Sequence, residues 1–314
     1  MQWQPSASIS TLRQRAAIII KIRDFFNERG YLEVETPVMA HYGVTDVYLS
    51  NINAIFRGQQ YCLQTSPEYH MKRLLAAGSG PIFQLARVFR DDELGRWHNP
   101  EFTLLEWYQL NIDHHTLMME MDELLQLVLQ CPPLTKKTYQ QVFQEVCDLD
   151  PFTASLLQLQ QTLARFNLDN VLDKNEEDRD QYLFLLMSHI VEPAFSGEKS
   201  PLAVYNFPPS QAALAQINNG VAERFEIYFR GVELANGFHE LTDADAQARR
   251  FNQDLVLREQ KGMEAVQADE FLLKALAHGV PACSGVALGI DRLIALALNQ
   301  PSIANTLAFD ISRA

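Results

Sequence analysis

The pattern of apolar and polar positions divides the chain into a helical start, a strand-rich section, a helical middle and a second strand-rich section. Apolar residues recur at helical spacing over residues 8–30, with Ser8 or Ser10 as the candidate cap and Gly30 after the last turn. This predicts a long amphipathic helix. A second helix is predicted from Pro67 through Leu75. Runs rich in β-branched and aromatic residues predict strands at 31–35, 60–64, 81–89 and 101–108.

The middle of the chain is rich in Leu, Gln and Glu at helical spacing from His114 to about Ile190, which predicts three or four helices. Further strands are predicted at 202–207, 222–229, 232–236 and 281–288, and further helices at 243–261, 269–278 and 289–298. This order predicts one α+β domain over residues 1–314, built on an antiparallel-rich mixed sheet flanked by helices. Residues 113–200 are then a helical insertion.

The composition is that of an ordinary globular protein, with 47% hydrophobic and 21% charged residues among 314. No apolar run approaches the roughly 20 residues of a membrane helix, and the first residues lack the pattern of a signal peptide. The cysteines are scattered, which favours free thiols in a reducing cytoplasm. A net charge of −13 argues against a surface that grips a nucleic-acid backbone.

The first segment that indicates chemistry runs over residues 88–108. Arg90 ends one strand, a polar loop follows, and the next strand alternates its side chains between two faces. One face then carries Phe102, Leu104, Glu106 and Tyr108. Such a face offers an aromatic ring on which a nucleotide base can stack, and the planar guanidinium group of the arginine suits a phosphate. An ordinary surface hairpin with ion pairs fits the same residues.

The second segment covers residues 225–243, where Gly231 indicates a turn between two strands. Glu233 and Glu240 are seven residues apart, so a regular strand places them on opposite faces, and a bulge at Gly237 would change that register. Paired carboxylates near a phosphate are suitable ligands for magnesium. Solvated charges on a strand face are the alternative.

The third segment runs from Ser284 to Arg292 and places small residues along a strand that leads into a helix. Small residues allow a ligand to approach the backbone closely. A helix N-terminus favours an anion, and a basic residue in the first turn, here Arg292, opposes the helix dipole. The segment therefore indicates a phosphate site, although it matches no P-loop and no GxGxxG pattern.

In this order, the three segments resemble the signature motifs of class II aminoacyl-tRNA synthetases, and most closely the catalytic domain of the lysyl type. Residues 13–39 resemble motif 1 and end near Pro37, which lies at the dimer interface in that family. Residues 89–102 resemble motif 2, residues 233–241 the lysine-specific segment, and residues 289–292 the end of motif 3. The resemblance covers nearly the whole chain.

Three departures from the lysyl type refine the expectation. Motif 1 starts within the first fifteen residues, which leaves no room for an anticodon-binding domain. The pattern is similar to free-standing paralogues that adenylate β-lysine and transfer it to a lysine side chain of translation elongation factor P. Ala287 replaces a glycine, and its methyl group would disfavour α-lysine by about 1–3 kcal/mol. Asp92 stands where the family usually has a longer glutamate.

The resemblance also implies ATP and Mg²⁺ as cofactors and assigns roles by position. Arg90 and Arg292 would be catalytic, holding the α- and γ-phosphates. The implied ATP-binding residues are Arg90, Asp91, Asp92, His98, Asn99, Phe102, Glu233, Leu234, Gly289 and Arg292. The implied substrate-binding residues are Ser66, Pro67, Glu68, Glu106, Tyr108, Asn236, Phe238, Glu240 and Ala287. Glu226 and Glu233 would hold the metal.

The expected partners are translation elongation factor P, lysine or β-lysine, and a second copy of the chain in a homodimer, with tRNA and membrane disfavoured. Two rival functions stay open on these residues. One is a minimal lysyl-tRNA synthetase-like enzyme that charges RNA through its acceptor stem. The other is a non-catalytic paralogue that senses an amino acid.

Overall fold

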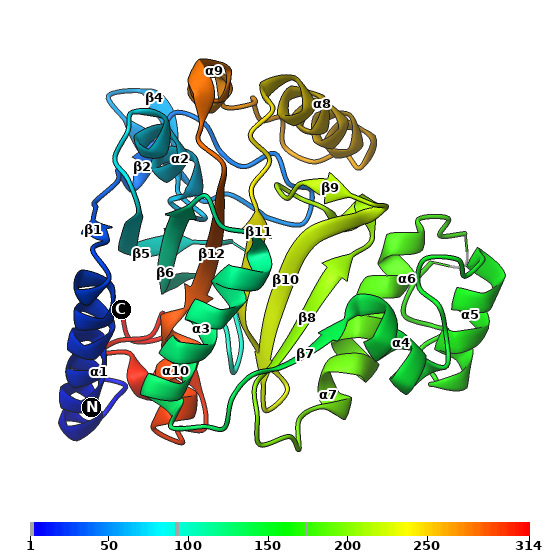
Figure 1. Cartoon of the computed structure of the whole chain (residues 1–314), viewed down its shortest axis with the longest axis horizontal. Helices are drawn as coiled ribbons and strands as arrows, with labels where there is room; N and C mark the ends of the chain where they lie inside the picture. Colours follow the sequence, from blue (N-terminus) through cyan, green and yellow to red (C-terminus); the bar gives the residue numbers. More distant parts are fainter. Residues whose placement is uncertain (1–2, 92–93, 174) are drawn as a thin grey trace. The chain divides into compact units, whose positions relative to one another are not determined.

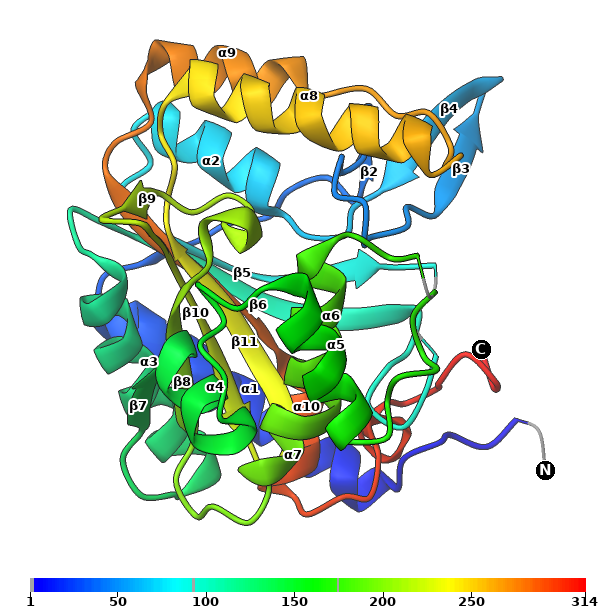
Figure 2. The ribbon, with the colours of Figure 1, turned by 90° about the vertical axis from the view of Figure 1, so that its right-hand side faces the viewer.

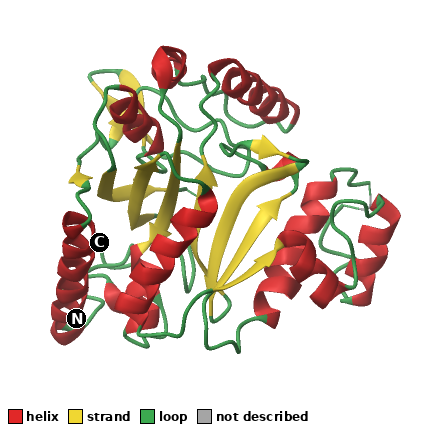
Figure 3. Cartoon of the chain, viewed as in Figure 1, coloured by secondary structure: helices red, strands yellow, loops and turns green. Residues whose placement is uncertain are grey.

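The computed structural model describes residues 3–91, 94–173 and 175–314. The chain forms two compact units: Met1–Gln130 together with Glu240–Ala314, and Cys131–His239 (Figure 1). Both units combine helices with a sheet (Figure 3). The predicted fold class, a mixed sheet flanked by helices, is confirmed. The expectation of a single domain over residues 1–314 stays a prediction.

The first unit contains four neighbouring strands in the order β1-β5-β6-β12. Their bounds are Leu32–Glu33, Ile82–Phe89, Glu101–Leu110 and Cys283–Gly289. β1 runs parallel to β5, whereas the β5–β6 and β6–β12 pairs are antiparallel. In this register Glu106 lies between Gln84 and Ala287, and Tyr108 lies beside Gly285. A smaller sheet has the order β2-β4-β3, with bounds Met39–Ala40, Gln59–Leu63 and Asn53–Phe56.

One face of the β5–β6–β12 sheet packs on helices α1 (Ile9–Glu28), α3 (His114–Leu129) and α10 (Ile290–Ala297). Ser8 caps α1 by accepting a hydrogen bond from the backbone N–H of Thr11, as one of the two predicted caps. Phe26 of α1 stacks on Phe83 at 4.7 Å between ring centroids and meets Trp107 edge-on at 5.1 Å. Because side chains alternate along β6, Glu106 and Tyr108 point to the other face.

On that other face lies α2 (Glu68–Ala76), which contacts α9 (Glu270–Gly279), and α9 in turn contacts α8 (Ala244–Gln260). The three helices run close together (Figure 2). Ser66, just before α2, donates a hydrogen bond to Glu106 on β6. The start of α2 is therefore held directly against the polar face of the sheet. A short 3₁₀ helix, η3 (Ile303–Thr306), precedes the C-terminus.

The second unit contains strands in the order β11-β10-β8-β7, with β9 beside β10. The bounds of β7 to β11 are Thr135–Thr138, Leu202–Phe207, Ile217–Asn218, Val221–Phe229 and Val232–His239. Its helical elements are α4 (Tyr139–Cys147), α5 (Leu156–Arg165), α6 (Arg179–Leu186), the π-helical turn η1 (Met187–Val191), α7 (Glu192–Ala194) and η2 (Pro209–Gln211). Capping boxes begin α4 and α5, which explains why these short helices start where they do. Their buried side chains form one apolar cluster with β8 and β10.

Two sequence-based expectations need correction. The three or four helices predicted between His114 and about Ile190 are present as α3 to α6, but this stretch also contains a strand that the sequence pattern does not predict, because Thr135–Thr138 forms β7, parallel to β8. This strand is short and polar, so its sequence lacks the apolar alternation of a strand. The irregular register in the β10–β11 pair lies between Ile227 and Tyr228, opposite Leu234, and Gly237 pairs regularly with Phe225.

All four cysteines are free, as their spacing predicts. Among the residues that the structure describes, no helix has both the length and the apolar character that crossing a membrane requires.

Candidate functional site

Buried carboxylates and one lysine gather on the polar face of the sheet in the first unit. The Lys72 ammonium nitrogen lies 2.6 Å from Glu68 Oε1 and 2.6 Å from Glu240 Oε2. The side chains of Lys72 and Glu240 are only 2% and 1% exposed. Lys72 follows Glu68 by one helical turn on α2, which places both side chains on the same face of that helix. One ammonium group therefore joins two of the predicted substrate-binding carboxylates.

Glu106 completes this cluster from β6. Its two carboxylate oxygens accept hydrogen bonds from the hydroxyl groups of Ser66 and Tyr108, each at 2.6 Å. Ser66 also accepts a hydrogen bond from the backbone N–H of Glu68 at 3.0 Å, which fixes the first turn of α2. The structure thus brings together five of the predicted substrate-binding residues: Ser66, Glu68, Glu106, Tyr108 and Glu240.

Burial changes the proton affinity of this cluster. It raises the pKa of Glu106 to about 7, with a further rise from the nearby Glu68. Burial likewise raises the pKa of Glu240 to about 8, against the opposing effect of Lys72. Burial alone would lower the pKa of Lys72, but Glu240 and Glu68 outweigh it and raise that pKa. Glu106 and Glu240 therefore release their protons at a higher pH than exposed glutamates do.

Gly285 of β12 leaves the space in which Tyr108 and Glu240 meet. A Cβ atom at this position would lie 2.3 Å from Tyr108 Cε1 and 2.6 Å from Glu240 Oε1. Tyr108 and Glu240 are 2% and 1% exposed, so neither side chain has room to move away. The glycine is therefore required by the close approach of these two side chains.

We expect Gly285→Ala to destabilise the protein by about 1–3 kcal/mol, the usual cost of forcing an extra methyl group into a packed core, and to weaken amino-acid binding. Chemical unfolding and calorimetric titration with lysine measure the two effects. Gly197→Ala is the control, since a Cβ atom there meets nothing within 4 Å. Equal stability of the two variants would contradict the assigned role of Gly285.

The predicted phosphate end of the site lies at the other end of β6. The Arg90 guanidinium carbon lies 5.1 Å from the centroid of the Phe102 ring. The backbone N–H of Arg90 donates to the Pro100 carbonyl at 3.0 Å, which closes the hairpin between β5 and β6. Phe102 and Glu106 share one face of β6, about 13 Å apart at the usual rise of a strand. This face can hold an extended ligand with a nucleotide at one end and amines at the other.

Arg292 reaches the same hairpin from the first turn of α10. Its Nε donates to the Trp97 carbonyl at 3.0 Å, and its Nη2 lies 2.7 Å from His98 Nε2. The neighbouring Asp291 is buried; its carboxylate accepts from the backbone N–H of Thr103 at 2.8 Å and pairs with Arg15 at 2.6 Å. Asp291 therefore fixes the start of α10 against β6, and Arg292 meets the same hairpin that carries Arg90.

Other predicted residues of the first unit have different surroundings. The Asn99 side chain donates to the Glu101 carbonyl at 2.6 Å and accepts from the backbone N–H of Ile311 at 3.0 Å, so its amide holds the C-terminal segment. Ala287 packs against an apolar group on the same face of the sheet: Ala86, Val88, Leu104 and Phe102. Gly289 is the N-cap of α10, and Pro67 is the N-cap of α2. Asp92 lies outside the described residues.

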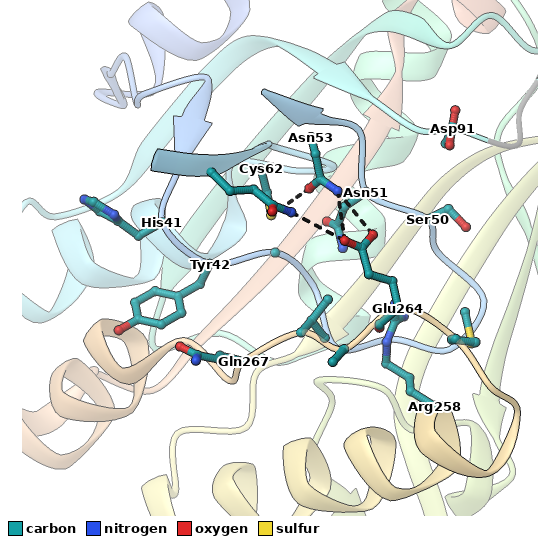
Figure 4. A pocket seen from close by; sticks show the side chains of 15 residues that line it. His41, Tyr42, Ser50, Asn51, Asn53, Cys62, Asp91, Arg258, Glu264 and Gln267 are labelled. Carbon is teal, nitrogen blue, oxygen red and sulfur yellow. Dashed lines mark hydrogen bonds between the residues drawn. The ribbon is translucent and has the colours of Figure 1, made fainter. Parts of the chain in front are cut away.

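Asp91 is exposed and lines a separate cavity of about 520 Å³ (Figure 4). The cavity lies between the β3–β4 sheet and the segment that follows α8. Its polar wall is organised by Glu264, which accepts hydrogen bonds from the side-chain amides of Asn53 and Gln60. Asp91 is the one residue that this cavity shares with the predicted site.

The remaining predicted residues lie on β10 and β11 of the second unit. The Glu226 carboxylate accepts hydrogen bonds from Arg224 and from the Tyr228 hydroxyl, and Arg224 also donates to Asn236 Oδ1 at 3.2 Å. Burial raises the pKa of Glu226; Arg224 opposes this rise and the nearby Glu233 adds to it. Leu234 is buried, and Glu233 and Phe238 are half-buried.

The donor chemistry of Glu226 and Glu233 fits a magnesium ion. Both groups offer carboxylate oxygens, the ligand type that magnesium prefers. Burial raises the pKa of Glu226 and the nearby Glu233 adds to the rise; a divalent cation between the two carboxylates would relieve both effects. A metal would have to share Glu226 with Arg224 and Tyr228, which already donate to it.

Sequence reasoning missed four residues that shape the site: Lys72, Gln84, Arg15 and Arg224. Gln84 is 4% exposed, and its carbonyl oxygen has no hydrogen-bond partner among the described residues, although it lies beside Glu106 in the sheet register. The spacing of Lys72, four residues after Glu68, was a signal for a helical ion pair. Arg15 and Gln84 lie beside residues far away in the sequence, whereas Arg224 pairs with Glu226 two positions further along the same strand.

Comparisons with known proteins show the family to which the chain belongs. The family tRNA synthetases class II (D, K and N) matches residues 1–313. Proteins named Elongation factor P–(R)-beta-lysine ligase from Salmonella paratyphi B and Salmonella schwarzengrund are each 53% identical to the chain over 321 aligned residues. A protein of the same name from Salmonella dublin is 54% identical. Each alignment covers 99% of this chain and 98% of the relative. The chain belongs to the class II tRNA synthetase family of the D, K and N type.

Proposed function

We propose that this protein is an ATP-dependent ligase that activates (R)-β-lysine, or lysine, as its adenylate and transfers it to a lysine side chain of translation elongation factor P. The observation that carries the proposal is the cluster of Glu68, Glu106 and Glu240, of which Glu106 and Glu240 are buried and Glu68 is 15% exposed; it suits a ligand with two ammonium groups. The relatives that align with the full chain carry the name of this activity.

The first step joins the amino acid to ATP. A carboxylate oxygen of the substrate attacks the α-phosphorus, the bond to the bridging oxygen breaks, and pyrophosphate leaves. Arg90 stabilises the charge that develops at the α-phosphate, and Arg292 orients the leaving group. Phe102 supports the adenine ring, and His98 and Asp91 lie at the same hairpin. Glu226 and Glu233 would hold Mg²⁺, which when bound neutralises phosphate charge. The carboxylate is already a nucleophile, so positioning and charge stabilisation suffice.

The second step consumes the adenylate. The neutral amine of the acceptor lysine attacks the carbonyl carbon, an amide bond forms, the bond to the phosphate oxygen breaks, and AMP leaves; the attacking nitrogen loses one proton to the solvent. The ammonium groups of the bound β-lysine stay in the carboxylate cluster during this transfer. The methyl group of Ala287, beside Glu106 in the sheet register, restricts the space near the substrate carboxylate and favours an amine one carbon further away.

Intact-mass analysis of elongation factor P tests the proposal. The factor is incubated with this protein, ATP and either (R)-β-lysine or α-lysine, and parallel reactions contain tRNA instead. We expect a gain in mass of one β-lysyl group, a smaller yield with α-lysine, and no charged tRNA. Charging of tRNA without modification of the factor would instead support the synthetase-like enzyme. Binding of lysine without any exchange of pyrophosphate would support the sensor.

The raised pKa values of the cluster predict a pH dependence of substrate binding. Glu106 and Glu240, with pKa values of about 7 and about 8, are largely protonated at pH 6 and ionised above pH 8. A protonated carboxyl group attracts an ammonium weakly, so KM for β-lysine should fall as pH rises from 6 to 8.5. Pyrophosphate exchange across this range measures it, with KM for ATP as the internal control. A flat KM for β-lysine would contradict the assignment.

We further infer that the protein is a cytoplasmic homodimer that does not use tRNA. The exposed Ile9 and Ile20 of α1 and the adjacent Leu32, each more than half exposed, support a self-association surface. The net charge of −13 and the free cysteines support a protein partner and a reducing compartment. Light scattering coupled to size-exclusion chromatography gives the oligomeric state directly.

A further inference from the structure

Lys72 occupies an unusual place for a lysine, because its ammonium is buried between two carboxylates that the proposed function assigns to the substrate. Fully buried lysines are rare, and they need compensating charges. Lys72 contacts Glu68 and Glu240 at the same distance of 2.6 Å, through one oxygen of each carboxylate. It reaches them from the side of α2, on which it is anchored one turn after Glu68.

We propose that Lys72 is a positioning residue of the amino-acid pocket: its ammonium holds the carboxylates of Glu68 and Glu240 in fixed orientations and offsets the repulsion between them, so that each can receive one ammonium group of a diamino acid. This inference rests on the proposed function and deepens it. The pocket then prefers a substrate with two amines because it contains two carboxylates with the ammonium of Lys72 between them.

The reason lies in the distance between the two carboxylates. Both oxygens lie 2.6 Å from the same nitrogen, so they are within about 5 Å of each other. A cation between two carboxylates this close offsets their mutual repulsion. Lys72 opposes the rise that burial causes in the pKa of Glu240, so without Lys72 that pKa would rise further and Glu240 would attract a substrate ammonium less at neutral pH.

A purely structural ion pair would behave differently. Removing one partner of a buried pair destabilises a protein whether or not the site binds a ligand. Such a role would lower stability and the amount of active protein, but it would not move the pH dependence of substrate binding. The pH profile therefore separates a positioning role from a structural one.

The experiment compares wild-type protein with Lys72→Met and Lys72→Arg in pyrophosphate exchange between pH 5.5 and 9. For Lys72→Met we expect KM for β-lysine at pH 7 to rise at least ten-fold. We also expect the midpoint of the acidic limb in the pH profile of kcat/KM to move to higher pH by one unit or more, while KM for ATP changes less than two-fold. Lys72→Arg keeps the charge, so its acidic limb should stay near that of the wild type while KM rises. Acidic limbs that coincide for wild type and Lys72→Met would overturn the inference.

Lys274→Met is the matched control, since Lys274 forms an exposed pair with Glu270 one helical turn before it, at 3.0 Å. This variant should match the wild type at every pH. Should Lys72→Met fail to fold, the double variant Lys72→Met/Glu68→Gln removes one carboxylate together with the cation. We expect it to fold and to return the acidic limb toward that of the wild type. A double variant that also fails to fold, or keeps a shifted limb, contradicts the inference.

A measurement without substrate separates this inference from the proposed function. Lys72→Met removes the ammonium that opposes the rise in the pKa of Glu240, so that pKa rises further above its unfolded value and the stability of the variant is lost progressively as pH rises toward it. The melting temperature of the variant should therefore fall further below that of the wild type between pH 5.5 and 8.5. If wild-type protein exchanges pyrophosphate with neither lysine nor β-lysine, the proposed function fails, while this widening gap still tests Lys72. A constant gap contradicts the inference even in an active enzyme.

Discussion

Replacing Arg90 by alanine should lower the rate of adenylation by at least about two orders of magnitude, the usual effect of removing a group that stabilises charge in a transition state. Arg90 lies beside Phe102, at the hairpin that Arg292 also contacts. The proposed function assigns its guanidinium to the α-phosphate, which the substrate carboxylate attacks. Pyrophosphate exchange at saturating ATP and β-lysine measures the effect on kcat.

Arg87→Ala is the control for Arg90. Arg87 lies on the same strand, is half-exposed, and forms a long ion pair of 3.8 Å with Glu101. Surface pairs of this kind contribute at most about 1 kcal/mol, so this variant should keep wild-type kcat within about two-fold. Unchanged exchange in Arg90→Ala would remove Arg90 from the mechanism and would leave the phosphate end of the site without its main charge.

Glu240→Gln should cause the largest loss of amino-acid binding. The substitution keeps the shape of the side chain but removes a buried charge from Lys72 and from the substrate. Hydrogen bonds to charged groups contribute about 1.5–3 kcal/mol, so KM for β-lysine should rise by at least about ten-fold. Breaking a buried ion pair also costs about 3–5 kcal/mol of stability. Exchange kinetics and chemical unfolding measure the two effects separately.

Glu270→Gln provides the comparison for Glu240→Gln, because Glu270 pairs with Lys274 on the surface of α9. This variant should keep the KM of the wild type and nearly its stability. If Glu240→Gln lowered stability alone and left KM for β-lysine unchanged, the carboxylate cluster would be a structural network. The substrate amines would then have to bind elsewhere.

Much of the local structure follows from short-range patterns in the sequence. The Ser8 cap and the apolar spacing of residues 9–28 specify α1, because capping and helical periodicity involve residues only a few positions apart. The alternation of Phe102, Leu104, Glu106 and Tyr108 likewise predicts one face of β6, since the side-chain period of a strand is two. The candidate residues of both ends of the site were therefore accessible without a structure.

Other features depend on partners that the local sequence does not specify. β7 is a strand because its backbone pairs with β8, although its side chains are polar and helices precede and follow it in the chain. The register shift of the β10–β11 pair is set by how two strands pack, so its position at Leu234 could not be read from glycine alone. Asn99 matched a binding motif, but its amide is engaged by the C-terminal segment.

The sequence by itself determined the family-type motifs, the residue types for an anion and a diamino acid, and the order of the elements. Only the tertiary structure decided how the charges are paired, because a buried ion pair forms between groups that the fold brings within hydrogen-bond distance. Glu240 meets Lys72 through the packing of α2 against the sheet, and Asp291 meets Arg15 through the packing of α1 and α10. The affinity of the cluster for protons follows from that burial, which no local pattern contains.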